Sequence, residues 1–160
     1  MTALKLSVVE HPEQLDVGSH RGLFDYWTRL RDAADIPSYD AIDVLQIERA
    51  LLPWLFLAER DGGRDDYYYR LVGTGIDEHN GFFATGQYLA ELPLSNKADM
   101  RKIFDRVVAT RQPHYCASRY LGVHRNYKLA RRLLLPLRGR GDDPAVRYII
   151  CAVDFMAAAD

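Results

Sequence analysis

The residues of this 160-residue chain that could do chemistry gather in two places. Asp77, Glu78 and His79 follow a glycine-containing turn, and the pair Arg131-Arg132 interrupts the apolar run LARRLLLPL. Adjacent residues on a helix point about 100° apart, so Asp77 and Glu78 do not form a facing acid pair. No serine, cysteine or histidine stands in a nucleophile motif such as G-x-S-x-G. The sequence therefore predicts no catalytic residue. One enzyme alternative stays open, a small isomerase or hydratase with a cone-shaped α+β pocket and His79 or Asp77 as its base.

The run Gly73-Thr74-Gly75 resembles the start of a dinucleotide-binding fingerprint. The third glycine of G-x-G-x-x-G would fall on Glu78, and an acid there would repel a pyrophosphate. A P-loop fails as well, because no Gly-Lys-Ser/Thr follows. We therefore expect these glycines to let the chain leave a strand sharply and begin a short helix at Ile76.

The two arginines raise a question of orientation. Strict alternation along a strand places one of Arg131 and Arg132 on the inner face, where a guanidinium needs an anion or several acceptors. Shared parity with Leu133 and Leu135 favours Arg131 as the inward residue. The alternative, in which both side chains reach solvent along their apolar stems, stays open.

Composition restricts the classes of function. Hydrophobic residues make up 48% and charged residues 27% of the chain, as in an ordinary globular domain. The formal net charge of −1 gives no general reason to expect nucleic acid or an anionic membrane as a partner. No apolar run reaches the roughly 18 residues of a membrane span, and the N-terminus lacks the apolar core of a signal peptide. With only two cysteines, neither a disulfide framework nor a thiolate metal site is expected, and we expect a cytoplasmic protein.

Periodicity predicts the elements that must position these residues. Apolar spacing of three and four predicts a helix over residues 20–34, and Asp43 is a suitable cap for a second helix over 43–50. The continuous apolar run at 51–58 predicts a strand that is covered on both faces, in a hairpin with 67–72. A helix over 97–110 and three strands over 114–121, 127–137 and 146–155 follow. Residues 1–19 are expected to be a partly mobile leader, 20–50 an N-terminal helical extension and 51–156 the main domain.

The segment LVGTGIDEHNGFFATGQYLAEL looks like the region after the second strand of a PAS domain. The order of a Trp27-containing helix, Leu51-Leu52-Pro53, the run YRLVGT and the run LLLPL also resembles the stand-alone PAS-like proteins common in alphaproteobacteria. The resemblance covers about residues 20 to 155. It implies an α+β fold with a five-stranded antiparallel sheet, in the order 2-1-5-4-3, and helices across one face. It also implies a sensory or regulatory role, by ligand binding or by protein contact, and we expect an unknown protein as the signalling partner.

A PAS-like fold would place a small, partly apolar ligand between the sheet and the middle helices. The candidate ligand-binding residues are Tyr69, His79, Phe82, Phe104 and Arg131, and a pocket that these side chains fill completely is the alternative. No cofactor is expected. The helix that usually carries a haem ligand in such domains contains no histidine here, and residues 74–96 lack the cysteine that covalent flavin photochemistry requires.

The first helix carries a large apolar stripe of Leu23, Phe24, Trp27 and Leu30. Burying each large apolar side chain is worth roughly 1.5–3 kcal/mol, so leaving the stripe in water would be costly. The helix either folds back on its own sheet or crosses to a second subunit. We expect a homodimer with this stripe at or near the interface.

Overall fold

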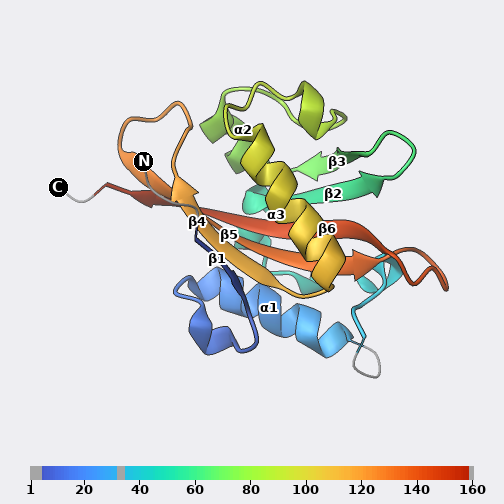
Figure 1. The fold of residues 1–160 in the computed structure, drawn as a ribbon. Coiled ribbons are helices and arrows are strands. Elements are labelled where there is room, and N and C mark those ends of the chain that lie inside the picture. The colour runs from blue at the N-terminus through green and yellow to red at the C-terminus, as the bar shows by residue number, and fades with distance from the viewer. Residues whose placement is uncertain (1–4, 32–34, 159–160) are drawn as a thin grey trace.

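The centre of the computed structural model, which describes residues 5–31 and 35–158, is one antiparallel sheet of six strands (Figure 1). The strands are β1 (Lys5–Val8), β2 (Leu55–Asp61), β3 (Asp66–Val72), β4 (His114–Arg119), β5 (Tyr127–Arg138) and β6 (Val146–Ala157). Their order across the sheet is β1-β4-β5-β6-β2-β3. The α+β class and the antiparallel sheet are confirmed, and β2 to β6 follow the predicted order 2-1-5-4-3. The predicted count of five strands was wrong, because β1 adds a sixth.

Strand β1 comes from the segment that was expected to be a leader. It pairs with β4 from Lys5 opposite Ala117 to Val8 opposite His114, and so covers the outer edge of β4. Val9 and Leu15 are then buried, at 3% and 1% exposure. A strand of four residues contains too few alternations for periodicity to reveal it, which is why the sequence pattern missed it.

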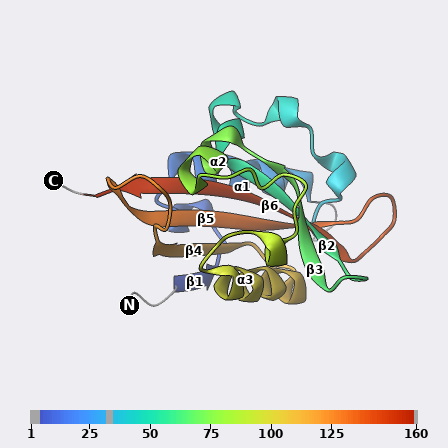
Figure 2. The same cartoon turned by 90° about the horizontal axis from the view of Figure 1, so that it is seen from above.

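Helices cover the two faces of the sheet. Helix α1 (Gly18–Leu30) lies on one face and helix α3 (Lys97–Thr110) lies across the other (Figures 1 and 2). The short helix α2 (Thr74–Asn80) joins the core on the α3 side through Ile76. Helix α3 begins and ends where its apolar spacing predicts, whereas α1 begins at Gly18 and ends at Leu30, before the predicted end at residue 34. Residues 32–34 lie outside the described residues.

The continuous apolar runs follow from this two-sided cover. In β5, Leu134 belongs to the core on the α3 side, while Leu133 and Leu135 belong to the core on the α1 side. In β2, Phe56 faces α3 and Leu55 faces α1. The cover expected on both faces is therefore confirmed for the part of residues 51–58 that is a strand, from Leu55 to Ala58.

The connection between α1 and β2 differs from the prediction. In place of a helix over 43–50, the chain makes three 3₁₀ helices, Tyr39–Ala41, Val44–Gln46 and Arg49–Trp54. Asp43 does cap the second of them, since its side chain accepts a hydrogen bond from the Leu45 amide at 3.0 Å. Pro53, near the end of the third, has no N–H for a longer helix or for a strand ladder, and β2 therefore begins at Leu55 rather than at residue 51.

Candidate functional site

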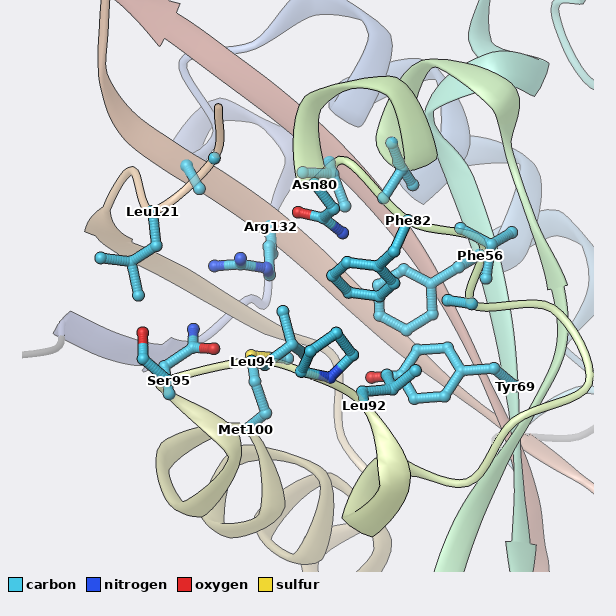
Figure 3. A pocket seen from close by; sticks show the side chains of 18 of the residues that line it. Phe56, Tyr69, Asn80, Phe82, Leu92, Leu94, Ser95, Met100, Leu121 and Arg132 are labelled. Atoms are coloured by element: carbon cyan, nitrogen blue, oxygen red, sulfur yellow. The ribbon is translucent and has the colours of Figure 1, made fainter. Parts of the chain in front are cut away.

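A cavity of about 170 Å³ lies between the sheet and the segment that contains α2 and the start of α3 (Figure 3). Its apolar wall comes from β2, β3, β6, α2 and α3, and includes Phe56, Val72, Ile76, Leu92, Met100 and Phe155. An engineered apolar cavity of about 150 Å³ is known to hold benzene. The space therefore suits a ligand of about that size.

Polar side chains from several elements also line this cavity. Arg132 extends from β5 into it, and its Nη1 donates a hydrogen bond to the Ser118 hydroxyl oxygen at 2.9 Å (Figure 3). Asn80, the last residue of α2, and Asn96, the N-cap residue of α3, also line it. The Asn96 side chain does not cap the helix, and its Oδ1 is buried without a partner among the described residues. None of the described lining residues is an aspartate or a glutamate.

Two of the predicted ligand-binding residues, Tyr69 and Phe82, line the cavity. Phe104 lies behind the wall, fully buried, with its ring centroid 5.0 Å from that of Tyr67 and 6.3 Å from that of Tyr69. Phe104 therefore supports the wall and does not face the space. The hydroxyl of Tyr67 donates to Asp105 Oδ1 at 2.8 Å, which fixes this aromatic layer to α3.

Arg131 lies on the other face of β5. It shares that face with Leu133 and Leu135, as its parity predicts, but the face packs against α1 rather than around the cavity. Arg131 Nε donates to Asp154 Oδ2 at 2.8 Å, so this guanidinium has its anion within the chain. Arg132, and not Arg131, faces the cavity. The prediction named Arg131 because it assumed that the cavity lies on the face of β5 that carries Leu133 and Leu135.

His79 is also separate from the cavity. Its Nδ1 lies 2.8 Å from the Tyr120 hydroxyl, and its ring stacks on Phe155 at 4.2 Å. It lines a second, more polar space of about 350 Å³ with Trp54 and Tyr127, and burial lowers the pKa of its imidazole. Asp77 accepts a hydrogen bond from the Ala84 amide, and burial raises the pKa of its carboxyl. The two bases considered for an isomerase or hydratase therefore do not line the apolar cavity.

The glycines before α2 serve close packing. A Cβ atom on Gly73 would lie 2.1 Å from the Pro53 carbonyl oxygen, and one on Gly75 would lie 2.7 Å from the Trp54 ring. The Gly73 amide donates to the Leu55 carbonyl oxygen at 2.7 Å. Gly73 and Gly75 thus let α2 approach residues 49–54, in agreement with the rejection of a phosphate loop.

The apolar stripe of α1 is buried within the chain. Leu23, Phe24 and Trp27 are 3–5% exposed against the sheet, and the half-buried Leu30 packs beside them. Trp27 Nε1 donates to the Pro136 carbonyl oxygen at 2.9 Å. Pro136 lies beyond the last β4–β5 pair, His114 with Leu134, so no β4 residue competes for this carbonyl. Of the two packings left open, the single chain adopts the intramolecular one, and the homodimer stays a prediction.

An apolar groove of about 690 Å³ lies on the α1 side of the sheet, away from the stripe. It runs between residues 39–54 and the hairpin of β2 and β3. Val44, Leu52 and Leu71 line it and are 54%, 38% and 57% exposed. Leu45, which follows Val44 in the chain, is 88% exposed. Sequence reasoning missed this surface, because residues 43–50 were expected to form a helix.

Comparison with protein families matches residues 15–149 to the family described as PAS domain. Neither the curated proteins nor the solved structures give a match. Within the described residues, no group of three or more His, Cys, Asp and Glu side chains could hold a metal ion. No helix in the same residues has the length and apolarity needed to cross a bilayer. The family match and the sheet order together show that this chain belongs to the PAS domain family.

Proposed function

We propose that this PAS domain is a sensory module that binds a small, partly apolar ligand between its sheet and α2–α3, and that reports binding through protein contacts. The observation that carries this proposal is the cavity of about 170 Å³, whose wall is mostly apolar and whose few polar groups converge from β5, α2 and α3. A mostly apolar space with a small number of placed polar groups is the usual form of a ligand site. No observation favours the isomerase or hydratase alternative, since His79 and Asp77 do not line this space.

The sheet is the physical link between the cavity and the other face. Arg132 lines the cavity, whereas its neighbour Arg131 holds Asp154 on the α1 side, so one strand carries both environments. Trp27 of α1 is hydrogen-bonded to Pro136 on that same strand. A shift of β5 on ligand binding would therefore move the surface of the sheet against which α1 packs. Interfaces and packed cores respond to such shifts by changing between discrete packings.

We propose further that the protein contact is a homodimer that uses the groove of Val44, Leu52 and Leu71. The groove is a hollow, and Leu45, which follows the groove-lining Val44 in the chain, is an apolar side chain at 88% exposure. A two-fold interface requires one surface that is complementary to itself, and a knob beside a hole satisfies this requirement. The stripe of α1 would then lie on the same side of the sheet as the interface, with its side chains still packed on the sheet.

A thermal-shift screen tests the ligand site. Fragments of about six to nine non-hydrogen atoms suit the cavity volume. A fragment at a hundred times its dissociation constant stabilises by about 2.7 kcal/mol, which raises the melting temperature by roughly 5–10 °C in a chain of this size. Ala130 lines the cavity at 1% exposure, so Ala130→Leu fills it and should abolish the shift. Ala84→Val, a milder filling change, is the second variant. Equal shifts in the wild type and both variants would refute the site.

Analytical ultracentrifugation tests the dimer. Leu45→Asp should make the protein monomeric at concentrations where the wild type is a dimer. Phe83→Asp is the matched control, because Phe83 is also a large, 79% exposed apolar side chain but does not line the groove. A wild type that is monomeric at high micromolar concentration, or a dimer that Phe83→Asp disrupts as strongly as Leu45→Asp, would contradict the proposed interface.

A further inference from the structure

No acidic side chain among the described lining residues balances the charge inside the cavity. Arg132 is half-buried and carries five N–H donors, and its described partners are neutral: the Ser118 hydroxyl at 2.9 Å and the Cys116 thiol. The carboxylate of Asp154 is already paired with Arg131, the neighbour of Arg132 in the chain. A guanidinium in such a place is stable only when an anion or several acceptors satisfy it. Figure 3 shows the guanidinium of Arg132 among the side chains that line the cavity.

A second group points to a ligand independently. Asn96 is the N-cap residue of α3, a position at which an asparagine side chain ordinarily accepts a backbone N–H of the first turn. Here it makes no cap bond, and its Oδ1 is buried without a partner among the described residues, in the cavity wall. The amino end of a 14-residue helix also favours negative charge nearby. Asn96 Oδ1 is an acceptor, so a ligand group that meets it must donate a hydrogen bond, and the charge of the ligand is inferred from Arg132.

The rest of the wall limits the kind of anion. Apolar side chains surround most of the space, among them Phe56, Ile76, Phe82 and Met100. They offer no hydrogen-bond donor to the several oxygens of a fully polar inorganic anion. The volume of about 170 Å³ admits a body close to the size of one benzene ring. A guanidinium binds a carboxylate through two parallel hydrogen bonds, and one inward arginine matches one carboxylate.

We propose that the ligand is a small monocarboxylate with an apolar body, and that Arg132 binds its carboxylate. This inference rests on the proposed ligand site and specifies its chemistry. Arg132 is the residue that selects the class of ligand, and the aromatic and aliphatic wall selects its size. Arg119, an exposed residue that lines the mouth of the same space, adds a second positive charge at the entrance and favours the entry of anions.

The test uses the intact chain and pairs of probes that differ only in charge. Benzoate and hexanoate are compared with benzamide and hexanamide by isothermal titration calorimetry, with thermal shift as a second readout. We expect the acids to bind at least ten times more tightly than the amides. Arg132→Gln should weaken the acids by about ten- to a hundredfold and leave the amides unchanged. Arg131→Gln is the matched control, since it removes the same charge one residue away on the other face and should not change the preference.

The outcomes separate this inference from the proposed site. Amides that bind as well as the acids, or acids that bind Arg132→Gln as well as the wild type, would overturn the carboxylate inference and leave the cavity as a ligand site. If neither acids nor amides bind the wild type, and the fragment screen also finds no ligand that Ala130→Leu excludes, both proposals fail. Circular dichroism of Arg132→Gln verifies that the variant is folded, and an equal loss of acid binding in Arg131→Gln would also count against Arg132 as the selecting residue.

Discussion

His20 makes the stability of this protein depend on pH in a way that one substitution can remove. It lies on α1 at 1% exposure, and neither ring nitrogen has a hydrogen-bond partner among the described residues. Desolvation lowers the pKa of His20 from 6.5 to about 4, against the opposing effect of Asp154 and with a smaller contribution from Arg131. The folded state therefore favours the neutral imidazole.

The direction of the effect follows from proton binding. Between pH 6.5 and pH 4 the unfolded chain binds a proton at His20 that the folded chain excludes, so the free energy of unfolding falls as the pH falls. This stability is fully present above pH 6.5 and is lost progressively down to about pH 4. With these two pKa values, the loss at this site between pH 7 and pH 5 is about 2 kcal/mol, and the limit at lower pH is about 3 kcal/mol.

Urea unfolding of the wild type and His20→Leu at pH 7 and pH 5 measures this contribution. Leucine cannot take up a proton, so the difference in unfolding free energy between the two pH values should be about 2 kcal/mol smaller in the variant. Other buried groups, such as His79 and His114, are present in both proteins and cancel in the comparison. The same pH dependence in His20→Leu as in the wild type would show that His20 is accessible to protons in the folded state.

Two further predictions concern α1 and the glycines before α2. Trp27→Phe keeps an aromatic ring on the sheet but removes the donor to the buried Pro136 carbonyl oxygen. Urea unfolding should therefore show a free energy of unfolding that is lower by about 1–3 kcal/mol. An unchanged midpoint would mean that this bond contributes nothing. Gly73→Ala should cost at least about 2 kcal/mol, because its Cβ would lie 2.1 Å from the Pro53 carbonyl oxygen. Gly22→Ala, in α1 with no atom within 4 Å of the new Cβ, should instead stabilise by about 0.5–1 kcal/mol, and equal effects at the two glycines would contradict the packing described around α2.

The parts of the fold that sequence reasoning predicted correctly are those with long, regular patterns. Helix α3 has a helical period over 14 residues, β5 and β6 are mostly apolar strands of 12 residues each, and the order of the five later strands came from the resemblance to PAS domains. The parts that it missed are short or irregular. Strand β1 has four residues, and of the three 3₁₀ helices before β2, the first two have no buried residue and the third buries only Leu51, so none has a period of 3.6.

The residues predicted for the ligand site divide between the cavity and other parts of the structure. Tyr69 and Phe82 line the cavity, because these aromatic side chains near the glycine turn face the core on the α3 side. Alternation correctly put Arg131 and Arg132 on opposite faces, but because both faces of β5 are buried, it could not say which face holds the cavity. Asn80 and Asn96 gave no signal, since an asparagine at a helix end is ordinarily read as a cap.

The central claim is that a ligand in the cavity changes the opposite face of the sheet. Hydrogen–deuterium exchange of the wild type, with and without a saturating concentration of the tightest-binding probe, tests it most directly. We predict altered exchange at the cavity and also in peptides from α1 and from residues 39–54, with the second change absent in Ala130→Leu. Changes confined to the segments that line the cavity would contradict the claim, because the ligand would then be bound without any signal reaching the surface proposed for the partner.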